Sequence, residues 1–153
     1  MPDDGGAPLD PAARLRLSLE PVASPGDVDV VQRGLLAFNE KHIGDPAAEA
    51  VHVFARDASG SIGGGLIGQI RWRWLYVATL WVAERWRGQG YGAALLAAAE
   101  DHARTRQCLG VHLDTFDYQA RPFYEKHGYE LFGTLEGYPP GHRQYHLAKR
   151  LDS

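Results

Sequence analysis

The sequence predicts one domain of the mixed α/β (α+β) class, with a twisted, mostly antiparallel sheet of about six to seven strands and about four helices. Its length of 153 residues fits a single domain. Segments with the period-two alternation of strands and segments with the 3.6-residue period of helices follow one another, separated by many of the 18 glycines and 9 prolines. The predicted order is β-α-(α)-β-β-β-α-β-α-β-β.

The N-terminal part combines a polar leader with the first strand and helix. Residues 1–13 are rich in Pro, Gly and Asp, so we expect a disordered leader there and one folded domain over 14–153. The sequence RLRLSLE at 14–20 alternates apolar and polar side chains, which predicts a strand. Ser-Pro-Gly-Asp at 24–27 offers helix-starting chemistry, and the apolar spacing that follows predicts a helix ending near Ile43.

The middle of the chain predicts three successive antiparallel strands. The apolar runs at 51–56 and 61–74 flank the turn sequence Asp-Ala-Ser-Gly at 57–60, which favours a hairpin. A more continuously apolar run at 75–83 predicts the third strand.

The last third alternates helices and strands. A helical stripe of leucine and alanine extends over 92–107, and 108–116 reads as a strand. The short segment 119–127 carries an early proline and is followed by a glycine, as helices often are. Strands at 129–136 and 143–151 then surround a Pro-Pro-Gly turn.

Composition excludes several classes of protein. The 16 basic and 19 acidic residues give a net charge of -3, without the basic excess that binds nucleic acid or anionic membranes. The single cysteine, Cys108, excludes a disulfide within the chain. No apolar run approaches the ~20 residues of a membrane-spanning helix, so we expect a cytoplasmic protein.

The sequence RWRGQGYG at 85–92 places three glycines where a helix begins. Glycines at a strand-to-helix turn let backbone approach a ligand, and the helix N-terminus attracts negative charge, so a phosphate is the expected occupant. No Lys-Ser or Lys-Thr pair follows, which excludes the P-loop. The spacing of Gly88, Gly90, Ala93 and Asp114 also allows a dinucleotide-binding fingerprint. The context does not favour it, because hairpins precede the turn and no second mononucleotide-binding half fits after it.

Two motifs resemble the GNAT superfamily of acyl-CoA N-acyltransferases, in particular its bacterial small-amine branch. Arg87-Gly88-Gln89-Gly90-Tyr91-Gly92 matches the pattern R/Q-x-x-G-x-G/A, and the sequence ARPFYEKHGY at 120–129 resembles the second signature. The resemblance covers the whole expected domain, and it implies the GNAT fold and acetyl-CoA as co-substrate, with no metal.

The resemblance also implies roles for named residues. The amine would attack the thioester directly, and Tyr124 matches the tyrosine that protonates the departing thiolate. A phenol with an ordinary pKa of about 10 suits that role. The pyrophosphate would lie on the turn and the pantetheine arm along the preceding strand. The cofactor-binding residues expected on this basis are Trp81, Val82, Arg87, Gly88, Gln89, Gly90, Tyr91, Gly92, Ala93, Ala120 and Phe123.

The residue that removes a proton from the acceptor stays open. Many family members carry a glutamate in the strand before the turn, whereas LYVATLWV at 75–82 contains no acid. Glu40, Asp114 and Asp117 are candidates for binding the acceptor's ammonium or relaying its proton, and a chain of water molecules is an alternative.

We therefore expect an N-acetyltransferase that acts on a primary amine of a small molecule, such as an aminoglycoside-like antibiotic or a polyamine. This activity would connect the protein with antibiotic resistance. The alternatives are acetylation of a protein lysine or N-terminus, and a non-catalytic acyl-CoA sensor. Exposed sheet edges favour a homodimer, and neither nucleic acid nor a membrane is an expected partner.

Overall fold

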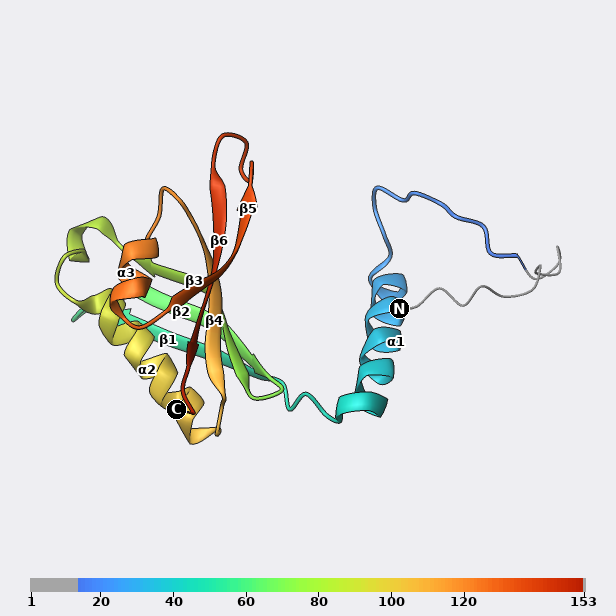
Figure 1. Ribbon diagram of the computed structural model, residues 1–153, viewed down its shortest axis with the longest axis horizontal. Helices are drawn as coiled ribbons and strands as arrows, with labels where there is room; N and C mark the ends of the chain where they lie inside the picture. The colour runs from blue at the N-terminus through green and yellow to red at the C-terminus, as the bar shows by residue number, and fades with distance from the viewer. Residues whose placement is uncertain (1–13, 153) are drawn as a thin grey trace. The chain divides into compact units, whose positions relative to one another are not determined.

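In the computed structural model, which describes residues 14–152, six strands form one sheet in the order β1-β2-β3-β4-β6-β5 (Figure 1). Neighbouring strands are antiparallel except for the parallel pair β3 and β4, so the predicted mixed, mostly antiparallel sheet is confirmed. The strands are β1 (Glu49–Arg56), β2 (Ile62–Arg71), β3 (Trp74–Val82), β4 (Gly110–Phe116), β5 (Glu130–Glu136) and β6 (Arg143–Arg150).

Contacts within the chain divide it between His42 and Ile43 into two units. The first contains all of the helix α1 (Pro25–Ile43) except its last residue. This helix begins after Ser24, because the Ser24 carbonyl accepts hydrogen bonds from the following turn at 3.0 and 3.1 Å. The predicted strand over 14–20 is wrong, since these residues have no regular secondary structure. A strand needs a hydrogen-bonded neighbour, which an alternating sequence alone does not provide.

The expected leader over 1–13 lies outside the described residues, and the single-domain expectation for 14–153 stays a prediction. The described part contains three α-helices and a short 3-10 helix, η2 (Glu84–Trp86), where about four helices were expected.

The second unit contains the hydrophobic core. The helix α2 (Tyr91–Thr105) packs against β1 to β4 through an apolar face that includes Leu95, Leu96 and Ala99. Leu66, Leu75, Val111, Leu113 and Leu147 come from the strands and are almost fully buried. The α2 stripe predicted from the sequence therefore forms the helix side of the core.

The parallel strands β3 and β4 separate partway along their length. Their pairing covers Trp74 to Val77 in β3 and Gly110 to Leu113 in β4. The register between β2 and β3 shifts between Ile67 and Gly68, which leaves Ala78 as the extra residue of a bulge. Bulges bend a strand, and this one lies where β3 leaves β4, so the two strands diverge from there (Figure 1).

Candidate active site

The divergence of β3 and β4 opens a cavity of about 1050 Å³. Its walls are the unpaired end of β3, the turn into α2, the end of β4 and the short helix α3 (Arg121–Lys126). Backbone groups at the unpaired ends of the strands are available to a ligand that lies between them like an added strand. A long, flexible molecule with amide groups, such as the pantetheine arm of coenzyme A, matches that geometry.

The glycine turn forms one end of this cavity. Gly88 and Gly90 have φ angles of 74° and 87°, in the left-handed region, and Gly90 is the N-cap of α2 without any side-chain cap. The first amide groups of α2 have no partner within the helix, so they are available to an anion. Both glycines line the cavity, which directs this anion-binding end into it.

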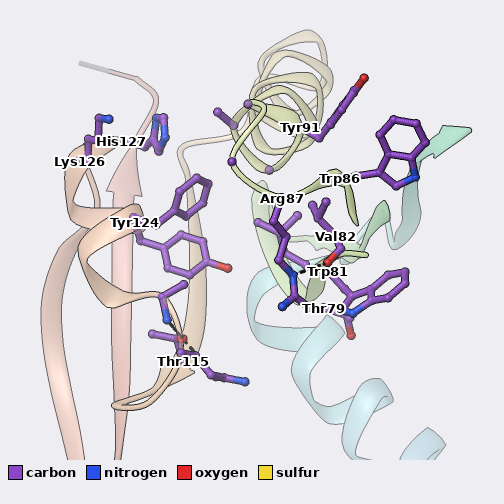
Figure 2. A pocket seen from close by; sticks show the side chains of 18 of the residues that line it. Thr79, Trp81, Val82, Trp86, Arg87, Tyr91, Thr115, Tyr124, Lys126 and His127 are labelled. Carbon is purple, nitrogen blue, oxygen red and sulfur yellow. Dashed lines mark hydrogen bonds between the residues drawn. The ribbon is translucent and has the colours of Figure 1, made fainter. Parts of the chain in front are cut away.

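The two arginines beside the turn have different positions. Arg87 lines the cavity, and its Nε donates a hydrogen bond of 2.9 Å to the Val82 carbonyl, which holds the guanidinium at the end of β3 (Figure 2). Arg85 instead contacts Asp57 at 3.4 Å and lies over the Trp86 ring, and it is not among the lining residues. Of the two guanidinium groups, Arg87 is therefore the one placed to bind a phosphate in the cavity.

Tyr124 lies on α3, with its ring buried between Phe123 and Tyr129 at centroid distances of 5.1 and 5.7 Å. Its hydroxyl makes no hydrogen bond to another group in residues 14–152, and Figure 2 shows it directed into the gap between α3 and β3. Burial, with a smaller contribution from the charge of Asp114, raises the pKa of Tyr124 to about 12. The phenol therefore stays protonated at neutral pH and can donate to a charge that develops in the cavity.

Asp114 lies on β4, just beyond the last residue that pairs with β3, and it also lines the cavity. Its carboxylate accepts hydrogen bonds from the Tyr76 hydroxyl at 2.7 Å and from Gln144 Nε2 at 3.2 Å. The bond to Asp114 and partial burial raise the pKa of Tyr76 to about 12. A carboxylate oriented by two donors keeps further lone pairs for a ligand cation.

The structure brings most of the predicted cofactor-binding residues together. Gln89 is the exception, because its amide donates to the Arg85 carbonyl at 3.3 Å and the residue does not line the cavity. The residues that do line it are Trp81, Val82, Arg87, Gly88, Gly90, Tyr91, Gly92, Ala93, Ala120 and Phe123.

The three predicted acceptor-binding acids have different outcomes. Asp114 lies in the cavity wall, whereas Asp117 is not a lining residue and hydrogen-bonds to His142. Glu40 belongs to α1 in the other unit, so its part in acceptor binding stays a prediction.

Sequence reasoning missed two residues of the cavity wall, Lys126 and His127. They lie at the end of α3, on the same side of Tyr124 as the start of α2 (Figure 2). Their signal was the Lys-His pair inside the second motif, which pointed to a helix end rather than to a cavity. Arg87 and Lys126 place positive charge in the cavity wall, and Asp114 adds a carboxylate where β3 and β4 begin to diverge.

The one cysteine of the sequence lies in the hydrophobic core. Cys108 is buried with 5% of its surface exposed, and burial raises the pKa of its thiol, which disfavours the nucleophilic thiolate. Among residues 14–152, no three His, Cys, Asp or Glu side chains are grouped to hold a metal ion. In the same part of the chain, no helix has the length and apolar character needed to cross a membrane.

Comparisons with known proteins agree with this geometry. A model of the acetyltransferase (GNAT) family matches residues 23–129. Blasticidin-S acetyltransferase of Streptomyces morookaense is 40% identical over 104 residues, which cover 67% of this chain and 76% of that protein. Acetyltransferase Atu2258 of Agrobacterium fabrum is 35% identical over 133 residues, which cover 87% of this chain and 97% of the relative.

A solved structure is similar over most of the chain. The crystal structure of an acetyltransferase from Bacillus cereus matches with a TM-score of 0.81 and 31% identity, covering 88% of this chain and 98% of the crystallised one. These similarities favour the acyl-CoA interpretation of the sequence over the dinucleotide interpretation that the spacing of its glycines also allowed.

Proposed function

The chain belongs to the GNAT family of acetyltransferases and is an acetyl-CoA-dependent N-acetyltransferase, and from that premise we propose that its acceptor is a primary amine of a cationic small molecule. The distribution of charge in the cavity carries the proposal. Arg87 and Lys126 line the cavity together with the start of α2, which suits the phosphates of acetyl-CoA, and Asp114 lies where β3 and β4 begin to diverge. An ammonium group fits beside that carboxylate.

The transfer proceeds by direct attack of the free amine on the thioester. The amine nitrogen forms a bond with the acetyl carbon, and the bond from this carbon to sulfur breaks. Tyr124 donates to the thiolate as negative charge develops on it, because its hydroxyl is protonated and points into the cavity. The described residues offer no exposed thiol for a covalent intermediate, since Cys108 is buried outside the cavity wall.

One related protein suggests which amines to test as acceptors. The name of the Streptomyces morookaense relative identifies blasticidin S as the substrate of that protein. An amine-bearing antibiotic is therefore our first candidate acceptor, and an aminoglycoside and a polyamine follow. Acetylation of such an antibiotic would connect the protein with resistance to it.

Two measurements test the proposal. Calorimetry should detect acetyl-CoA binding in the micromolar range and none with NADPH, as expected for the phosphate site of an acyl-CoA enzyme. Release of CoA is then followed with a thiol reagent for blasticidin S, kanamycin, spermidine and a lysine-containing peptide. Because Cys108 is buried, it should contribute little to the thiol signal.

The result separates the proposed function from its alternatives. Turnover with a small amine but not with the peptide supports the proposal. Turnover with the peptide alone would indicate protein acetylation, and acetyl-CoA binding without any turnover would indicate a sensor.

A further inference from the structure

A glutamine side chain with two unused donors lies in the cavity wall. Gln119 follows β4 and lines the cavity. Its Oε1 accepts hydrogen bonds from the Phe116 backbone amide at 2.7 Å and from Thr115 Oγ1 at 3.2 Å. A backbone amide can only donate, so the side-chain atom beside it is the oxygen, and Nε2 is the other atom of the amide. Nε2 makes no hydrogen bond within residues 14–152, so both of its N–H groups are available to a ligand.

The contact with Thr115 places this amide on the core face of the sheet. Successive residues of a strand point to opposite faces. Leu113 and Thr115 of β4 are buried on the face that carries the core, and Asp114 between them points to the other face. Tyr124 belongs to the core cluster as well. The Gln119 amide therefore lies on the same side of the sheet as Tyr124, and the Asp114 carboxylate lies on the opposite side.

The order of groups along acetyl-CoA indicates which of its oxygen atoms meets this amide. The phosphates, the pantetheine arm, the sulfur and the acetyl group follow one another in that molecule. The site described above holds the phosphates at the start of α2 and the sulfur at the Tyr124 hydroxyl. Figure 2 shows Tyr91, the first residue of α2, and Thr115 on opposite sides of that hydroxyl. The group that extends past the sulfur towards Thr115 and Gln119 is therefore the acetyl group.

The acetyl carbonyl oxygen is the atom that gains negative charge when an amine attacks the thioester. Resting on the proposed function, we propose that Gln119 Nε2 donates a hydrogen bond to this oxygen and stabilises its charge in the transition state. Gln119 is then a catalytic residue, because it contacts a reacting atom. Its amide is already oriented by the Phe116 and Thr115 donors, and such preorganised donors need no rearrangement during the reaction.

The electrons and protons balance in this step. The lone pair of the free amine forms the C–N bond, and the π electrons of the carbonyl move to its oxygen, which Gln119 binds without giving up a proton. The C=O bond then forms again as the C–S bond breaks, and the electron pair of that bond leaves with sulfur. Tyr124 gives its proton to the sulfur and regains one from the nitrogen. The products are the acetamide and CoA thiol.

Gln119→Glu separates the two ends of the side-chain amide. A carboxylate still accepts from the Phe116 amide and the Thr115 hydroxyl, but it has no N–H to donate. With the acceptor that turns over fastest, single-turnover kcat should fall about 100-fold, because loss of one such donor costs about 10²- to 10³-fold. The affinity for CoA, which lacks the acetyl group, should stay within about twofold in calorimetry. Gln119→Met removes the donors without adding charge and should lose a similar factor in kcat.

Infrared spectroscopy supplies a readout that a merely structural role would not move. The probe is acetyl-CoA labelled with carbon-13 at the thioester carbonyl and bound to the protein without an acceptor. A hydrogen bond to a carbonyl oxygen lowers its stretching frequency, so the band should lie at a higher frequency in both Gln119 variants than in the wild type.

Gln107→Glu is the matched control. It makes the same substitution and adds the same charge, but Gln107 follows the C-terminal end of α2 and is not a lining residue of the cavity. This variant should keep the wild-type kcat and carbonyl band. Urea unfolding of all variants shows whether a loss of kcat comes from a damaged fold, because Gln119→Glu should keep the wild-type midpoint.

The outcomes distinguish this proposal from the one on which it rests. Wild-type kcat and an unmoved band in Gln119→Glu would show that Gln119 only fastens the turn after β4, and would overturn the inference while leaving the acetyltransferase assignment intact. Equal losses of affinity for CoA and acetyl-CoA with unchanged kcat would move the donor to an amide of the pantetheine arm, and would overturn it too. Wild-type protein that binds acetyl-CoA but acetylates none of the four acceptors would overturn the proposed function, whereas the band, which needs no turnover, would still test the hydrogen bond.

Discussion

Replacement of Tyr124 by phenylalanine removes one oxygen atom and leaves the packing of the ring in place. The Tyr124 hydroxyl has no hydrogen-bond partner in residues 14–152, and the ring keeps its contacts with Phe123 and Tyr129. The free energy of unfolding should therefore change by less than about 0.5 kcal/mol. Acetyl-CoA affinity should also stay within about twofold, since the thioester ground state carries little charge for the hydroxyl to stabilise.

The effect on turnover follows from the pKa values of the two reacting groups. The Tyr124 pKa of about 12 lies well above the ordinary thiol pKa of about 8.5, so the phenol gives up its proton late, after thiolate charge has developed. General acids contribute about 10²- to 10⁴-fold, and a weak acid belongs at the lower end of that range. We expect kcat to fall about 100-fold in Tyr124→Phe.

The assay is single-turnover acetyl transfer, combined with calorimetry for acetyl-CoA binding. Tyr129→Phe is the control, because Tyr129 lies beside Tyr124 but its buried hydroxyl has no hydrogen-bond partner in the described residues. Removing this oxygen should leave kcat unchanged and stabilise the fold by about 1 kcal/mol. A Tyr124→Phe variant with wild-type kcat would refute the acid role.

Alkaline unfolding adds an independent check on the environment of Tyr124. Its folded-state pKa of about 12 is raised above the ordinary value of about 10, so the folded state retains a proton that the unfolded state releases in this interval. The contribution of Tyr124 to stability is therefore complete below about pH 10 and decreases as the pH rises towards 12. Tyr124→Phe should lack this part of the alkaline loss, which urea titrations at several pH values measure.

Three further substitutions test other parts of the structure. Gly90→Glu should abolish acetyl-CoA binding in calorimetry, because it adds a negative charge at the α2 N-terminus. Gly90→Ala is the control, because it changes only how well residue 90 tolerates its φ of 87° and adds no charge. Equal losses of acetyl-CoA affinity in the two variants would contradict phosphate binding at this turn. Asp114→Asn should raise KM for a cationic amine at least about tenfold without changing acetyl-CoA affinity, by loss of an attractive charge. It should also lower the pKa of Tyr76 from about 12, which ultraviolet titration detects, and an unchanged KM would remove Asp114 from the acceptor site. Lys149→Met should destabilise the fold by about 3 kcal/mol in urea, because it leaves the buried Glu100 carboxylate without its partner at 2.9 Å. The double variant with Glu100→Leu should recover most of that loss, and a destabilisation that persists in it would contradict the charge argument.

Much of the fold followed from local patterns in the sequence. Helix α2 was predicted from its stripe of leucine and alanine, which needs no knowledge of what it packs against. The hairpin of β1 and β2 and the final pair β5 and β6 were predicted from alternation and turn residues. The strand expected over 14–20 failed, because alternation describes a strand's faces but not the neighbour that completes its hydrogen bonds.

For the candidate site too, some features could be predicted from the sequence and others needed the tertiary structure. The glycine turn and Tyr124 were identifiable because each belongs to a contiguous motif, and a motif keeps its residues adjacent in any fold. Sheet pairing and tertiary contacts, in contrast, decided that β3 and β4 diverge around a cavity and that Lys126 and His127 line it together with the start of α2. They also brought Tyr76 and Gln144 to Asp114, and His142 to Asp117, from strands and loops distant in sequence. A sequence by itself determines which side chains and local conformations are present. These polar side chains became neighbours only through the register and curvature of the sheet, because both depend on contacts along the whole chain.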